Sequence, residues 1–170
     1  MRSPLPLLLP LATSALLACG GAASTTMEPT ANDFATHVAE LEGEFNAHAT
    51  KAAAAPDVTG IATLDGTHRT MSLEVLTKLD GMLTHLSMCT NASHAKPDMM
   101  VCHDAMAKLR TAAEAHSAKM ATMANLTDAR AEEERHHMEM GTQLAAMMTH
   151  AAAVKKTAAS YTCDGSMGGH

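Results

Sequence analysis

The chain has 170 residues, with 12 basic and 18 acidic side chains and a formal net charge of −6, so a nucleic acid is not an expected partner. It has no Trp, one Tyr and two Phe, so its core must be built from Ala, Leu and Met. The 15 Met and 11 His are the unusual part of the composition. Met fills gaps in apolar cores and is also a soft metal ligand, and the composition is compatible with both uses.

The first eighteen residues have the pattern of an export signal. Arg2 is followed by an apolar stretch that is too short to span a bilayer, and the stretch closes with the run LLACG at positions 16–20. This run resembles the signal of bacterial lipoproteins, which implies cleavage before Cys19, a lipid on Cys19 and a mature chain tethered to the membrane. Gly20 after the cysteine implies the outer membrane, facing the periplasm. An ordinary secretory signal or a short uncleaved anchor would also export the chain.

The rest of the chain predicts four helices in one domain. Residues 19–32 are small and polar, as in a flexible tether, and we expect helices from about residue 32 or 33 to 55, from 67 to 90, from 97 to 125 and from 127 to about 160. Pro, Gly and Asp in residues 56–66 indicate a loop, and the Gly-rich residues 161–170 indicate a flexible tail. Similar lengths and short connections predict an all-α, antiparallel up-down four-helix bundle over residues 33–160.

Each helix has inward residues at alternating spacings of three and four. These are, in chain order, Phe34, Val38, Leu41, Phe45, His48 and Ala52; His68, Ser72, Val75, Leu79, Met82, Leu86 and Cys89; Met99, Cys102, Met106, Leu109, Ala113, His116, Met120 and Met123; Arg130, Glu133, His137, Met140, Leu144, Met147, Ala151 and Val154.

Three cysteines are expected at the tether end of the bundle. In an exported protein, Cys89 and Cys102 are placed to form a disulfide between the second and third helices. Cys163 would then remain as a thiol beside Met167 and His170, a soft donor set suited to Cu(I). The alternative is that Cys163 itself pairs with Cys89 or Cys102.

A second group of donors is expected inside the other half of the bundle. His48, His116 and His137 lie at inward positions of three helices and at similar heights, so they predict a metal site. Further ligands within about one turn would be soft or carboxylate side chains: Met120, Met140, Glu44 and Glu133. The alternative is that each His is a single polar residue in the core.

The run EEERHH at positions 132–137 contains two Glu-x-x-His pairs, Glu133 with His136 and Glu134 with His137. This spacing is similar to that of ferritin-like di-iron bundles, but no other predicted helix has a Glu-x-x-His pair, so the chain departs from their pattern. Adjacent helical residues differ by about 100° in direction, so one of His136 and His137 faces the core, and the inward spacing favours His137.

Three functions follow from these patterns. The first is a membrane-tethered metal-binding lipoprotein that buffers a transition metal, copper before zinc, because His- and Met-rich exported helical proteins resemble periplasmic copper binders, including copper storage four-helix bundles. The second is a metal-free helical lipoprotein that binds an unidentified envelope protein. The third is a ferritin-like metalloenzyme, although no complete catalytic constellation is present and no enzymatic activity is expected.

Overall fold

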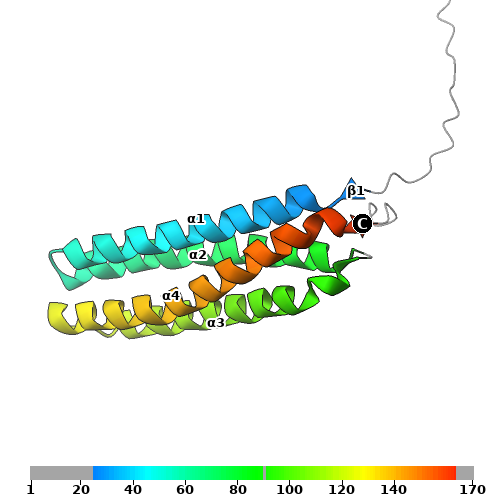
Figure 1. Cartoon of the computed structure of the whole chain (residues 1–170). Helices are drawn as coiled ribbons and strands as arrows, with labels where there is room; N and C mark the ends of the chain where they lie inside the picture. The colour runs from blue at the N-terminus through cyan, green and yellow to red at the C-terminus, as the bar shows by residue number, and fades with distance from the viewer. Residues whose placement is uncertain (1–24, 90, 164–170) are drawn as a thin grey trace, which may run out of the picture.

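The computed structural model describes residues 25–89 and 91–163. Four long helices make up most of this range: α1 (Glu28–Ala54), α2 (Val58–Ser87), α3 (Lys96–Met120) and α4 (Leu126–Thr157). Successive helices run in opposite directions, and α1 packs against α4 as well as against α2, so the helices form a closed ring (Figure 1). The predicted all-α, up-down four-helix bundle is confirmed.

The ends of the described chain meet at one end of the bundle. Strand β1 (Thr25–Thr26), which Figure 1 shows beside the start of α1, pairs in antiparallel fashion with β2 (Thr162–Cys163). Two short 3₁₀ helices flank the long ones, η1 (Ala92–His94) before α3 and η2 (Ala158–Ser160) after α4. Tyr161 follows η2, is fully buried and exchanges a 2.9 Å hydrogen bond with the Thr157 hydroxyl.

The predicted tether and tail were therefore too long. Residues 25–32 belong to β1 and the first turn of α1, and residues 161–163 pack onto the bundle through Tyr161 and β2. The remainder of both segments lies outside the described residues, as do the predicted signal of residues 1–18 and the predicted lipid site at Cys19.

The inward residues of α1 and α3 follow the predicted spacing. Every predicted inward residue of α1 is buried, with Ala31 added one turn earlier. All predicted inward residues within α3 are buried, and Ala105 and Ala112 widen the stripe, whereas the predicted Met123 lies beyond the end of the helix and is only partly buried. Alternating steps of three and four keep side chains on one helical face, so the apolar pattern alone specifies which side enters the core.

Helix α2 begins nine residues earlier than predicted. Asp57 caps its N-terminus by accepting a 2.8 Å hydrogen bond from the backbone N–H of Gly60. Gly60 and Gly66 lie within the helix although glycine costs about 1 kcal/mol relative to alanine there. Burial of Ile61 and Asp65, one turn apart on the inner face, shows that tertiary packing overrides this local preference.

The first turns of α4 are rotated relative to the prediction. Asn125 caps the helix by accepting a 2.9 Å hydrogen bond from the backbone N–H of Asp128. Ala129 and His136 are buried, whereas the predicted Arg130 is exposed and His137 is partly exposed. Counting back from the buried Met140, a step of four reaches His136 and a step of three reaches His137, and the α-helical repeat allows either.

The two helical hairpins, α1–α2 and α3–α4, share one layout. Helix α3 begins 68 positions after α1 (96 − 28), and α4 begins 68 positions after α2 (126 − 58). The same shift relates the capping residues Asp57 and Asn125, which make equivalent hydrogen bonds, and the prolines Pro29 and Pro97 in the first turns of α1 and α3. The second hairpin is thus a structural repeat of the first.

The core has three layers along the bundle. A large apolar cluster fills the half near β1 and β2, and a small one, which includes Ala52, Ile61 and Met120, closes the opposite end. Between them along the helices lies a layer of buried polar and charged side chains. Among the described helices, none is apolar enough over a sufficient length to cross a membrane.

Candidate metal centre

The polar layer contains one histidine from each helix: His48 of α1, His68 of α2, His116 of α3 and His136 of α4. None of these side chains is more than 5% exposed. The other members of the layer are Ser72 and three carboxylates, Asp65, Glu132 and Glu133. Burying such groups is expensive unless they are paired or bind an ion, so this layer is the outstanding candidate for a functional site.

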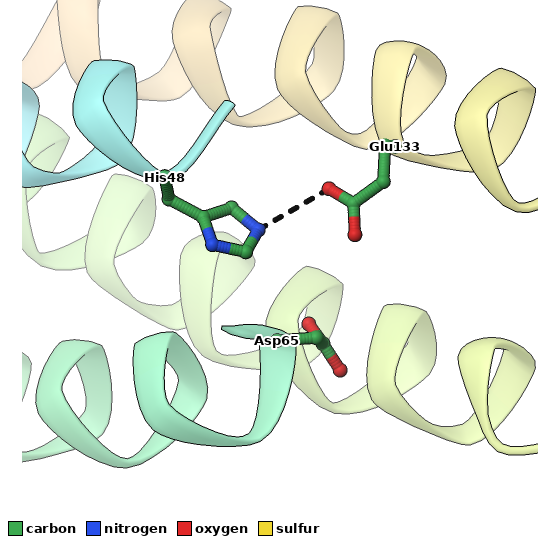
Figure 2. Close-up of side chains that lie close together, drawn as sticks. All are labelled: His48, Asp65 and Glu133. Atoms are coloured by element: carbon green, nitrogen blue, oxygen red, sulfur yellow. Dashed lines mark hydrogen bonds and ion pairs between the residues drawn. The ribbon is translucent and has the colours of Figure 1, made fainter. Parts of the chain in front are cut away.

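Glu133 lies at the middle of the layer. Its Oε2 accepts a 3.2 Å hydrogen bond from Nε2 of His48, and its Oε1 accepts one of 3.2 Å from Nε2 of His116. Asp65 Oδ1 lies 3.3 Å from the same Nε2 of His116. Figure 2 shows the His48 ring and the Glu133 carboxylate facing each other, with Asp65 on the neighbouring helix.

Three of these side chains have the spacing of metal ligands. One donor atom from each of His48, Asp65 and Glu133 lies within 4.8 Å of the other two, and all three residues are buried (Figure 2). They come from α1, α2 and α4, so only the assembled bundle brings them together. Imidazole nitrogen with carboxylate oxygen is a ligand set that proteins use for first-row transition metals.

The other two histidines stack on the first pair. The rings of His48 and His68 have centroids 4.3 Å apart at an angle of 12°, and those of His116 and His136 have centroids 3.9 Å apart at 7°. Within the described part of the chain, Nδ1 of His68 and Nδ1 of His136 are buried without a hydrogen-bond partner. Because buried polar atoms are nearly always paired, these two nitrogens are candidate metal donors.

The charges within the layer are strongly coupled. Burial alone would lower the pKa of His116, but its hydrogen bonds to Asp65 and Glu133 prevail and raise it to about 9. For Glu133, burial opposes ionisation, but hydrogen bonds from His116 and His48 lower its pKa to about 2. In the metal-free chain, His116 is therefore protonated at neutral pH and lies between the carboxylates of Asp65 and Glu133, 3.3 and 3.2 Å away.

Glu132 holds His116 from the other side. Its Oε1 lies 3.5 Å from Nδ1 of His116, while Arg135 and Lys119 contact its carboxylate from the surface. The hydrogen bond from Arg135 is the main reason that the pKa of Glu132 is lowered to about 2. A carboxylate on the far nitrogen of an imidazole orients the ring and makes it a better metal ligand.

We predict that the metal-free chain is most stable near pH 6.5. Burial and the neighbouring His48 lower the pKa of His68 to about 4, and burial and His116 lower that of His136 to about 3. The unfolded chain therefore binds more protons below pH 6.5, and stability falls with acidification by up to about 1.4 kcal/mol per pH unit for each group. Between pH 6.5 and about 9, the folded chain still binds the His116 proton that the unfolded chain has lost, so stability falls as the pH rises.

Urea unfolding in EDTA at pH 5.0, 6.5 and 9.0 measures this dependence. His68→Gln and His136→Gln should each flatten the acid limb, whereas His103→Gln, a 66% exposed histidine, should leave it unchanged. Equal acid limbs in all three variants would contradict the assignment. The carboxylates of Glu132 and Glu133, whose pKa values are lowered, affect the pH dependence of stability only below their unfolded pKa of 4.5. That pH lies outside the measured range.

A surface groove leads to the layer. It has a volume of about 310 Å³, lies between α1 and α4 and is lined by Ala49, Ala53, Arg130, Glu133, Glu134 and His137. Glu133 is the residue that the groove shares with the buried cluster. A metal ion therefore has a short route from solvent to the central carboxylate.

The structure brings together part of the predicted site. His48, His116 and Glu133 converge as predicted. His137 was the wrong choice for α4, because its Nε2 hydrogen-bonds to Asn46 at 3.2 Å and its partly exposed ring stacks on Phe45.

The remaining predicted ligands lie elsewhere. Glu44 is exposed. Met120 packs in the small apolar cluster and Met140 in the large one, so both fill the core.

Three central residues were missed. Asp65 was assigned to a loop, and His68 was predicted to face inward but was not named as a ligand. For α4, His137 was predicted to face the core in place of His136. The shift of 68 positions would have found all three, because it relates His48 to His116, Asp65 to Glu133 and His68 to His136.

The predicted disulfide is also corrected. Cys89 bonds to Cys163, with Cα atoms 4.4 Å apart, and Cys102 is a free, buried cysteine. This is the alternative that the sequence left open, and the pairing of β1 with β2, which sequence spacing did not reveal, fixes the position of Cys163. The proposed soft donor set of Cys163, Met167 and His170 loses its thiol, and the other two residues lie outside the described range.

Comparison of the chain with protein-family models, with curated proteins and with solved structures finds no match in any of the three. The geometry of the polar layer is therefore the feature of this chain that indicates its function.

Proposed function

We propose that this protein binds a transition metal ion inside the helical bundle and holds it for buffering or sequestration. The observation that carries the proposal is the convergence of His48, Asp65 and Glu133, three buried donors within 4.8 Å of one another. The adjacent His116 and the two buried histidine nitrogens without partners support it. A purely structural polar network would have no need to leave those nitrogens unpaired.

The donor chemistry favours a divalent ion. Imidazole and carboxylate suit Zn(II), Cu(II), Fe(II) and Mn(II), whereas Cu(I) prefers thiolate and thioether sulfur. Among the described residues, the sulfur ligands predicted from the sequence are used otherwise: Cys163 is in the disulfide, and Met120 and Met140 pack in the apolar clusters. The two metals expected from the sequence were copper and zinc. This donor set suits both of them as divalent ions, Cu(II) and Zn(II).

Metal loading of the purified chain tests the proposal. The EDTA-stripped protein is loaded separately with Zn(II), Cu(II), Mn(II) and Cu(I), desalted against a competing chelator and analysed for bound metal. We expect a divalent ion to be retained, and His48→Ala and Glu133→Gln to weaken its binding by at least about tenfold. The matched controls are His103→Ala and Glu134→Gln, which change an exposed histidine and the exposed neighbour of Glu133.

Two outcomes would contradict the proposal. One is the absence of any retained ion. The other is an equal loss in the control variants, which would indicate adventitious binding by a histidine-rich surface. Either result would favour the metal-free interaction protein, with the polar layer serving only to align the helices.

We further propose that the bundle is exported and tethered to the outer membrane through a lipid on Cys19. The run LLACG at positions 16–20 supports this, and so does the Cys89–Cys163 disulfide, because such bonds persist in oxidising compartments. The intact mass of the chain from a bacterial membrane fraction checks it: an unmodified Cys19 or another N-terminus would refute the lipid anchor.

A further inference from the structure

The donors of the polar layer occur in two equivalent sets. Each helical hairpin contributes one histidine from its first helix and an acid-x-x-His pair from its second. In the first hairpin these are His48, Asp65 and His68, and in the second they are His116, Glu133 and His136. Each residue of the second set follows its counterpart by the same 68 positions that relate the helix starts.

Several contacts made by the two sets are also equivalent. His48 of the first hairpin contacts Glu133 of the second at 3.2 Å, and His116 of the second contacts Asp65 of the first at 3.3 Å. In each hairpin the two histidines stack on each other, and in each the acid-x-x-His histidine has the buried, unpaired Nδ1. The layer thus has an approximate two-fold symmetry, although only the second hairpin has the additional Glu132 where the first has Leu64.

The two carboxylates lie between the histidine pairs. Glu133 directs Oε2 to His48 and Oε1 to His116, so its two oxygens face different pairs. Asp65 contacts His116 directly and also lies within 4.8 Å of the donor nitrogen of His48. A carboxylate with one oxygen toward each of two ligand groups has the arrangement that bridges two ions about 3.5 to 4 Å apart.

On the basis of the proposed function, we infer that this layer is a dinuclear centre. His48 and His68 hold one divalent first-row ion, His116 and His136 hold the other, and Asp65 and Glu133 bridge them. Each ion then has two nitrogen and two oxygen ligands from the protein, and water completes the coordination. Glu132 is a positioning residue, since it contacts His116 on the nitrogen that faces away from Glu133.

The number of ions bound per chain tests this inference. The EDTA-stripped full chain is titrated with Zn(II) and with Cu(II), desalted and analysed for metal content. We expect two ions per chain in the wild type and one each in the double variants His48→Ala/His68→Ala and His116→Ala/His136→Ala. The control His37→Ala/His103→Ala, which removes one histidine outside the layer from each hairpin, should keep two.

Electron paramagnetic resonance of the Cu(II) form is the second readout. Bridged Cu(II) ions couple, so at two equivalents the wild type should lose most of its mononuclear signal, whereas each double variant should show the full signal of one isolated ion. One ion per chain in the wild type would overturn the dinuclear centre and leave the proposed function standing. No ion at all would overturn both. The wild-type count decides the matter even if a double variant does not fold.

Discussion

Replacement of Glu133 by Ala is expected to destabilise the metal-free chain by about 3–5 kcal/mol, the cost of removing one partner of a buried ion pair. The carboxylate accepts hydrogen bonds from His48 and His116, and its side chain is only 9% exposed. Its loss leaves His48 without this partner and the protonated His116 with fewer acceptors in a buried site. Urea unfolding at pH 7 in EDTA measures the free energy directly.

Glu134→Ala is the matched control, because Glu134 is the next residue of the same helix and is exposed. Its free energy of unfolding should change by no more than about 0.5 kcal/mol. A double-mutant cycle of Glu133→Ala with His116→Ala should be strongly non-additive, because each single change removes the same contact. Additive effects, or equal effects at Glu133 and Glu134, would show that the layer does not act as a coupled network.

Loss of the Cys89–Cys163 disulfide is the second large effect that we expect. The bond links residues 74 positions apart, and closing a loop of that length in the unfolded chain corresponds to about 4 kcal/mol. Cys163→Ser should therefore lower the free energy of unfolding by about that amount. The strands β1 and β2 should separate first, because Cys163 lies in β2 itself.

Reduction of the wild type should reproduce this loss, and reductant should have no further effect on Cys163→Ser. Cys102→Ser is the control: Cys102 is buried, donates only a weak 3.8 Å hydrogen bond to the Met147 carbonyl and takes no part in the disulfide. That variant should remain as sensitive to reductant as the wild type. A Cys102→Ser protein insensitive to reductant would show that the bond involves Cys102 instead.

The sequence was sufficient to predict the bundle because a helical apolar pattern is a local property. The steps of three and four from Phe34 to Ala52 place these side chains on one face whatever surrounds them. The same reasoning correctly placed His48 and His116 inside, at matching heights on two helices. Local patterns thus determined the four helices, the inner faces of α1 and α3 and the inward direction of three of the four central histidines, His48, His68 and His116.

Local patterns were misleading where tertiary packing decides between near-equal alternatives. The glycines at positions 60 and 66 suggested a loop, and that reading hid Asp65, although the Asp57 cap and the burial of Ile61 make this segment helical. The choice between His136 and His137 depends on how α4 is rotated against its neighbours, and neighbouring residues differ by only about 100°.

The sequence by itself determined an all-α bundle, a net negative charge and a supply of histidines facing inward. Only the tertiary structure decided that one histidine from every helix meets Asp65 and Glu133 in a single layer, and that Cys163 rather than Cys102 bonds to Cys89. The physical reason is the same in both cases. Distances between separate helices depend on how their faces pack, and residue spacing along one helix carries no information about them.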